Sequence, residues 1–194
     1  GSFRLIPGHI PGFEALGLPL DVAQLTEYRE GLVLVTGPGG SGKSTTLASF
    51  INMLNKSRRE HIITLEDPIE YVFKPGAGHI SQRQVGLHTR SYSDALRAAL
   101  REDPDIIVVG ELRDRETVSL AVTAAETGHL VLATLHTTSA AQTIHRLQDL
   151  FPPEQRNQIR SQISESLKGI VCQRLIPRKD GSGLCLAVEL LFNI

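Results

Sequence analysis

The sequence contains no tryptophan and only one methionine, and none of its apolar runs approaches the roughly 20 residues of a membrane-spanning helix. Its two cysteines, Cys172 and Cys185, are too few for a disulfide framework and lack the spacing of a metal site. The 20 Lys and Arg residues are balanced by 21 Asp and Glu residues, so the chain has no excess of positive charge that would indicate a nucleic-acid or membrane-surface partner. These absences favour a cytoplasmic protein, and 194 residues suffice for one packed domain.

Short apolar runs alternate with segments of helical spacing along most of the chain. This order predicts an α/β domain with a mostly parallel sheet flanked by helices. Strands are predicted over residues 32–36, 61–66, 105–110 and 129–135, and a C-terminal β-hairpin over 170–176 and 184–192. Helices are predicted after Gly42, over 91–102, 114–127 and 138–150, and after Pro153. Ligands of such sheets bind beyond the carboxyl ends of the strands, so we expect the functional residues there.

A glycine-rich segment between the first predicted strand and helix fits the pattern G-x-x-x-x-G-K-[ST]. It predicts a P-loop whose backbone N–H groups surround a polyphosphate. Lys43 is expected on the β- and γ-phosphates, Ser44 on Mg²⁺, and Thr45 near the α-phosphate. The predicted nucleotide-binding residues are Gly37, Pro38, Gly39, Gly40, Ser41, Gly42, Lys43, Ser44 and Thr45. A nucleoside triphosphate is the expected ligand, but hydrolysis, transfer and sensing all remain open from this motif.

Two groups of carboxylates follow predicted strands. Glu111 comes at the tip of an apolar strand, where a carboxylate next to a γ-phosphate can orient and deprotonate a water molecule. Glu66, Asp67 and Glu70 flank Pro68 after another strand, and their mutual repulsion requires a nearby positive charge. Bound Mg²⁺ or the Arg-rich segment 83–101 can supply that charge. The alternative for this cluster is a turn of solvated acids.

His136 and a group of arginines complete the candidate site. The histidine lies at the carboxyl end of a predicted strand, where an imidazole can hydrogen-bond a γ-phosphate and report its loss. Arg97 and Arg101 are four residues apart and are expected to share one helical face. With Arg113 and Arg115 they can pair with the acidic cluster or reach a phosphate in a neighbouring subunit. A solvated basic face is the alternative.

Four motif blocks, at residues 37–46, 63–71, 103–114 and 127–141, occur in the order of the Walker A, Asp box, Walker B and His box. In this combination the chain resembles the secretion-ATPase superfamily of type IV pilus and type II secretion motors. The resemblance runs from about Phe3 to Ile194 and is strongest to PilT-type pilus retraction ATPases. Assembly and type II secretion motors usually carry a four-cysteine zinc module after the segment matching 173–175, and this sequence has none there.

The resemblance implies a P-loop NTPase fold, a RecA-like ATPase domain over residues 21–194, with residues 1–20 as a linker and the start of the motor domain. Phe3–Pro7 resembles that linker, and a PAS-like N-terminal domain and a C-terminal helical tail are expected outside this chain. ATP and Mg²⁺ are the implied cofactors, bound by Lys43 and Ser44. Glu111 is implied as the water activator, Glu70 as a second catalytic or Mg²⁺ carboxylate, His136 as the γ-phosphate histidine, and Arg97 and Arg101 as sensors of a neighbour's nucleotide.

The resemblance also implies a biological role. The implied protein is a hexameric ATPase at the cytoplasmic face of the inner membrane, where it is peripheral and has no membrane span. It is expected to work on a pilus platform protein and to power pilus retraction for twitching motility. The first alternative is a pilus or secretion assembly ATPase of the same superfamily. A more distant alternative is a RecA-like regulatory or DNA-binding protein, which the balanced charge disfavours.

Overall fold

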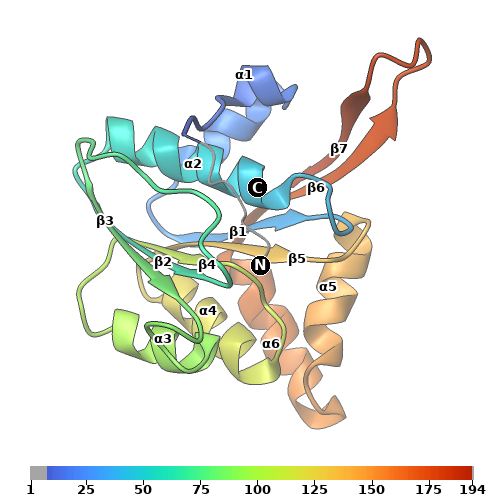
Figure 1. The fold of residues 1–194 in the computed structure, drawn as a ribbon. Helices are drawn as coiled ribbons and strands as arrows, with labels where there is room; N and C mark the ends of the chain where they lie inside the picture. Colours follow the sequence, from blue (N-terminus) through green and yellow to red (C-terminus); the bar gives the residue numbers. More distant parts are fainter. Residues whose placement is uncertain (1–7, 194) are drawn as a thin grey trace.

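The computed structural model describes residues 8–193, so Phe3–Pro7 lies outside the described residues. One seven-stranded sheet runs through the molecule in the order β3-β2-β4-β5-β1-β6-β7 (Figure 1). All neighbouring strands are parallel except β6 and β7, which form an antiparallel hairpin. The strands are β1 Gly31–Thr36, β2 His61–Glu66, β3 His79–Gln84, β4 Ile106–Val109, β5 Leu130–Leu135, β6 Leu167–Pro177 and β7 Leu184–Phe192. The predicted α/β class and the C-terminal hairpin are confirmed.

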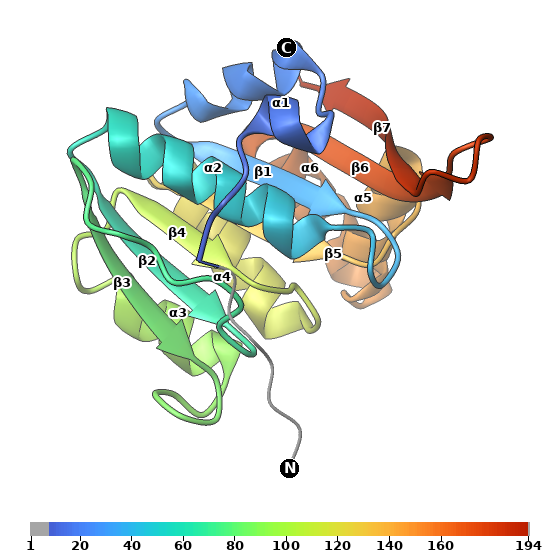
Figure 2. The same ribbon diagram turned by 45° about the horizontal axis from the view of Figure 1, so that its top comes forward.

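Helices cover both faces of this sheet, as Figure 2 shows. The α-helices are α1 Phe13–Leu16, α2 Lys43–Ser57, α3 Tyr92–Ala99, α4 Arg115–Glu126, α5 Ala140–Asp149 and α6 Pro153–Ser166, and a 3₁₀ helix, η1, spans Leu20–Thr26. One face carries α1, η1 and α2, and the other carries α3, α4, α5 and α6 (Figures 1 and 2). No helix among residues 8–193 is long and apolar enough to cross a bilayer.

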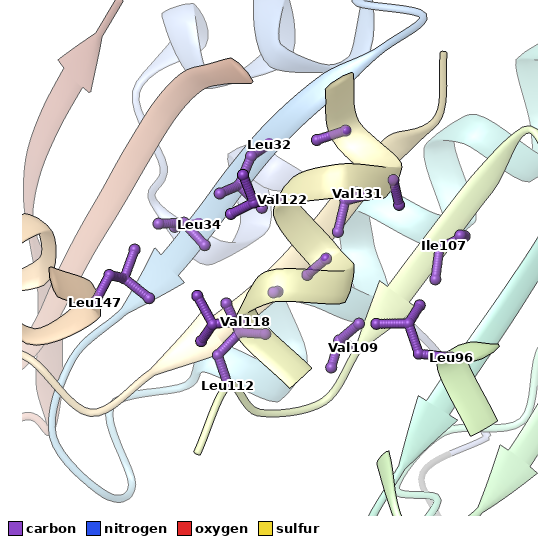
Figure 3. Packing of buried hydrophobic residues seen from close by; sticks show 14 of the residues in the cluster. Leu32, Leu34, Leu96, Ile107, Val109, Leu112, Val118, Val122, Val131 and Leu147 are labelled. Carbon is purple, nitrogen blue, oxygen red and sulfur yellow. The ribbon is translucent and has the colours of Figure 1, made fainter. Parts of the chain in front are cut away.

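The central strands β1, β4 and β5 are buried at every residue because helices cover both of their faces. Successive side chains of β1 alternate between the two layers: Leu34 packs on the α4 side and Val35 on the α2 side. Figure 3 shows Val118 and Val122 of α4 among the side chains of the sheet. On the other face, Phe50 of α2 is fully buried, which anchors α2 and the loop before it.

Several elements differ from the sequence-based expectation. Strand β3 was not predicted because its sequence, HISQRQ, has no run of apolar residues. The helix predicted over 91–102 ends at Ala99, since Pro104 disfavours helical conformation at Asp103 and the chain tightens into a turn before it. Arg101 therefore lies beyond α3. Strand β6 begins at Leu167, directly after α6 and three residues earlier than expected.

The carboxyl ends of the parallel strands meet at one edge of the domain. The loops that leave β1, β2, β4 and β5 there are residues 37–42, 67–78, 110–114 and 136–139. These four loops carry the four motif blocks. The topology therefore brings together segments that are up to about 100 residues apart in the sequence, as expected for ligand sites of parallel sheets.

Candidate functional site

The loop between β1 and α2 has the backbone of a phosphate cradle. Gly37, Gly40 and Gly42 have φ values of 145°, 73° and 88°, a region that favours glycine. Gly37 also has no room for a side chain, because a Cβ there would lie 2.2 Å from the carbonyl oxygen of Gln173. The loop opens directly into the first turn of α2, whose free N–H groups provide an anion-binding end.

Lys43 begins α2 and its side chain folds back over the loop. Its Nζ donates hydrogen bonds to the carbonyl oxygens of Gly37 and Pro38, both at 2.9 Å. Burial lowers the pKa of Lys43, and the nearby negative charge of Glu111 partly offsets that effect. The ammonium group is thus held where the loop and the carboxylate of the Walker B block converge.

His136 lies between Lys43 and Glu111. Its Nδ1 is 3.4 Å from Lys43 Nζ, and its Nε2 is 3.4 Å from Glu111 Oε1. A neutral imidazole with its hydrogen on Nε2 satisfies both contacts, because it accepts from the ammonium and donates to the carboxylate. The other carboxylate oxygen, Glu111 Oε2, accepts a hydrogen bond from Arg113 Nε at 2.7 Å. Residues from three different motif blocks are therefore in contact.

The carboxylates at the end of β2 and in the acidic loop after it, residues 67–78, differ in exposure: Glu66 is half-buried and Asp67 is exposed. Glu66 Oε1 accepts hydrogen bonds from Thr64 Oγ1 at 2.7 Å and Gln82 Nε2 at 3.0 Å. Burial raises the pKa of the Glu66 carboxyl, and these hydrogen bonds act in the opposite direction. Asp67 is exposed and lies 3.8 Å from Arg113 Nη1. Arg113, which follows Glu111, is therefore the arginine beside the acidic cluster.

Two glutamines of the edge strand β3 hold the acidic loop, and the sequence reasoning missed both. Gln82 donates through Nε2 to the carbonyl of Tyr71 at 2.8 Å and accepts through Oε1 from the N–H of Phe73 at 3.3 Å. Gln84 Oε1 accepts from the N–H of Ile69 at 3.2 Å. The two amides fix the backbone on both sides of Glu70. Alternate glutamines in a short polar segment are the only sequence signal of this role.

The other predicted arginines lie on the surface of the α3 and α4 layer. Arg97 forms an ion pair with Glu116 of α4, and Arg83 pairs with Glu102. Arg101 is exposed in the turn after α3. Among the described residues, neither Arg97 nor Arg101 lines the cavity at the carboxyl ends of the strands. Within the described residues, Arg97 is paired with Glu116 and not with the acidic cluster.

A cavity of about 260 Å³ joins the P-loop to the acidic loop. Its polar wall includes Gly39, Gly40, Lys43, Ser44, Glu70, Glu111 and His136. Gly37, Pro38, Ser41, Gly42 and Thr45 lie outside this lining, and Thr45 Oγ1 is hydrogen-bonded to the Tyr71 hydroxyl at 2.9 Å. Hydroxyl and carboxylate oxygens from Ser44 and Glu70 share the wall, and these are donors that Mg²⁺ prefers. The residues present fit a Mg²⁺–nucleotide.

Tyr92 also reaches this cavity and was not singled out from the sequence. It begins α3, is 8% exposed, and leaves no room for a side chain at Gly110, where a Cβ would lie 2.8 Å from its hydroxyl. Burial and the negative charge of Asp67 raise the pKa of the Tyr92 phenol. The hydroxyl therefore stays protonated beside the carboxylates of the cavity.

Known proteins resemble this chain over nearly its whole length. The family model described as type II/IV secretion system protein matches residues 17–186. The chain is 52% identical over 191 residues to the type IV pilus retraction ATPase PilT of Pseudomonas aeruginosa, covering 98% of this chain and 55% of that protein. It is 50% identical over 192 residues to the uncharacterized protein YggR of Escherichia coli, covering 99% of this chain and 59% of YggR.

Among solved structures, the pilus retraction motor PilT with bound ADP superimposes with a TM-score of 0.95 at 56% identity. That match covers 98% of this chain and 55% of the PilT chain. The chain thus spans little more than half the length of these relatives. Both the family model and the relatives cover the four loops that meet at the cavity. The chain therefore belongs to the type II/IV secretion system protein family.

Proposed function

We propose that this chain is the ATP-hydrolysing core of a pilus retraction motor. The observation that carries the proposal is the contact of Lys43, His136 and Glu111 at the end of the P-loop. It brings a phosphate-binding cation, a hydrogen-bonding imidazole and a carboxylate to one wall of a single cavity. Identity of 52% to a pilus retraction ATPase supports retraction as the process that is powered.

Each residue of the cavity has a role in this proposal. The free backbone N–H groups of the P-loop and of the first turn of α2, together with the ammonium of Lys43, hold the phosphates, and the hydroxyl of Ser44 and the carboxylate of Glu70 would hold Mg²⁺. The bound metal neutralises charge on the phosphates. Glu111, which forms an ion pair with Arg113, orients a water molecule and accepts its proton. The Nε2–H of His136, which faces Glu111 in this structure, donates to the γ-phosphate when that group is bound.

The proposed coupling of hydrolysis to motion starts at His136. When the γ-phosphate is present, it competes with Glu111 for the one N–H of the imidazole. When phosphate leaves, His136 retains only its contacts with Lys43 and Glu111, which changes the loop after β5 and biases its packing. A loop with two packings of similar energy is the kind of element that converts loss of a phosphate into a domain movement.

The proposal extends to the assembly. Residues 21–194 form the RecA-like ATPase domain of a hexameric ring at the cytoplasmic face of the inner membrane, where it works on a pilus platform protein. Arg97 and Arg101 lie on the surface of their own chain, and in this proposal they contact the nucleotide of a neighbouring subunit. Neither arginine is among the residues that line the cavity of their own chain, which is consistent with this assignment.

The test is steady-state hydrolysis of Mg-ATP by the full-length protein, measured for the wild type and for Glu111→Gln. We expect the substitution to lower kcat about 100-fold or more while ATP binding is retained, because the amide cannot accept a proton. Glu154→Gln, an exposed carboxylate on α6, is the matched control and should hydrolyse ATP normally. Near-wild-type hydrolysis by Glu111→Gln contradicts the proposal.

In cells, loss of a retraction motor leaves surplus pili, whereas loss of an assembly motor leaves none.

A further inference from the structure

Gln173 is a buried polar residue of β6 that touches the P-loop from behind. Thr36, the last residue of β1, pairs with Cys172, so Gln173 stands one residue further along, where the loop leaves the sheet. Its side chain is 2% exposed, and its Nε2 donates a hydrogen bond of 2.7 Å to the carbonyl oxygen of Ser41. The contact joins residues that are 132 positions apart.

The P-loop is shaped around Gln173 on two sides. A Cβ at Gly37 would lie 2.2 Å from the Gln173 carbonyl oxygen, and one at Gly42 would lie 3.2 Å from Nε2. Glycine is therefore required at position 37 partly because the backbone of β6 lies so close, and Gly42 packs tightly against the Gln173 amide. Gln173 contacts the loop at Ser41 and is not among the residues that line the cavity of Lys43 and Ser44.

The hydrogen bond determines the direction of one peptide group. A phosphate-binding loop must turn its N–H groups toward the ligand and its carbonyls away from it. Lys43 Nζ binds the carbonyls of Gly37 and Pro38, and Gln173 Nε2 binds the carbonyl of Ser41. Because Gln173 is buried, water does not readily replace its amide, and without it the Ser41 carbonyl loses its partner. Gln173 has no part in the roles proposed for Lys43, Glu111 and His136.

We propose that Gln173 is a positioning residue that holds the P-loop, through the Ser41 carbonyl, in the conformation that binds phosphate. This inference rests on the proposed function, because it assumes that residues 37–44 bind a nucleotide. Gln173 does not contact the phosphates. Loss of the Gln173 amide loosens the P-loop, and part of the free energy of nucleotide binding is then needed to order the loop again.

The experiment compares Gln173→Met, Gln173→Glu and the wild type in the full-length protein. Methionine keeps the length of the side chain but removes the donor, and glutamate replaces the donor by a second acceptor. We expect Kd for Mg-ADP and KM for Mg-ATP to rise about five- to tenfold in Gln173→Met, the loss of about one hydrogen bond, with a smaller change in kcat. Gln162→Met is the matched control: Gln162 of α6 binds Glu126 on the far side of the domain.

A pH series separates positioning from general damage to the fold. A protonated glutamate again donates to the Ser41 carbonyl, so the Kd of Gln173→Glu relative to wild type should fall as the pH is lowered from 8 to 5.5. The same ratio for Gln173→Met should stay constant. Thermal unfolding of each variant without nucleotide confirms that the protein compared is folded.

The outcomes separate this inference from the proposed function. If the wild type fails to bind Mg-ADP, the proposed function fails. If the wild type binds and folded Gln173→Met binds equally well, or if Gln173→Glu shows no recovery at low pH, the positioning role is overturned. Weaker binding by Gln173→Met, recovery of Gln173→Glu at low pH and unchanged binding by Gln162→Met support it.

Discussion

Glu111 and His136 are in direct contact, with 3.4 Å between Oε1 of the carboxylate and Nε2 of the imidazole. The opposite nitrogen of the same ring lies 3.4 Å from the ammonium of Lys43. The imidazole therefore bridges the lysine that we propose to bind phosphate and the carboxylate that we propose to activate water. A change at either one alters the hydrogen bonding of the other through a single ring.

Replacing His136 should affect turnover more than binding. In His136→Gln the side chain no longer spans Lys43 and Glu111, and a donor to the γ-phosphate is displaced. We expect kcat for Mg-ATP to fall about 10- to 100-fold, the value of a hydrogen bond to a charged group, while Kd for Mg-ADP changes little. His145→Gln, on the exposed face of α5, is the control in the same assays. An equal loss of ADP affinity would show that His136 acts mainly in binding.

Replacing Lys43 should abolish tight nucleotide binding. Lys43→Ala removes a buried ammonium together with its hydrogen bonds to the carbonyls of Gly37 and Pro38. We expect Kd for Mg-ATP to rise at least about tenfold, because hydrogen bonds from a charged group to phosphate are strong. Titration of a fluorescent ATP analogue measures the change. Lys56→Ala, an exposed lysine of the same helix, should bind normally, and a similar loss in both variants would argue against a specific role.

The ion pair of Arg97 and Glu116 allows a paired test of the subunit contact. Both side chains are at least half exposed, so the pair itself should contribute only about 0.2–1 kcal/mol to the free energy of unfolding. Arg97→Gln and Glu116→Gln should therefore lower stability equally and slightly. If Arg97 contacts the nucleotide of a neighbour, only Arg97→Gln will lower ATP turnover of the assembled protein. Equal turnover in the two variants would leave Arg97 with no function beyond the ion pair.

The buried carboxyl of Glu66 should make stability depend on pH. Burial raises its pKa above the ordinary value of 4.5, so in the window above 4.5 the folded state binds a proton that the unfolded state has released. Stability from this group is present at low pH and is lost as the pH rises through the folded pKa. Glu66→Gln removes this dependence. Urea unfolding at several pH values should show the free energy of unfolding of the variant increasing relative to that of the wild type as the pH rises from 4.5. A difference that stays constant with pH would contradict this prediction.

The predicted strands match β1, β2, β4 and β5 within one residue at each end because buried parallel strands are continuous apolar runs. Strand β3 lies at the edge of the sheet and is half-buried or exposed, so its side chains do not need to be apolar. Its pairing with β2 arises from backbone hydrogen bonds, which leave no pattern in the side chains. The short α1 and η1 were likewise missed, because four and seven residues are too few for helical periodicity.

The candidate site was predictable where residue type and chain position are both restrictive. The P-loop motif requires glycines, a lysine and a serine because of the chemistry of phosphate and Mg²⁺ binding. Glu111 and His136 follow parallel strands, whose carboxyl ends meet at one edge of the sheet. The roles of Gln82 and Gln173 were not predictable, because each depends on a partner that only the folded sheet brings near. A glutamine can make these contacts from many positions, so its type alone carries little information.

The two edge strands of the sheet differ in a way that bears on solubility and on growth of the sheet. Strand β3 carries His79, Ser81 and Arg83 along its length, and polar and charged edges discourage pairing with strands of other molecules. Strand β7, of sequence LCLAVELLF, is apolar for eight of its nine residues and half-buried over most of its length. Among the described residues, the sheet therefore has one polar edge and one largely apolar edge, and of the two the β7 edge carries fewer of the features that discourage pairing with a further strand.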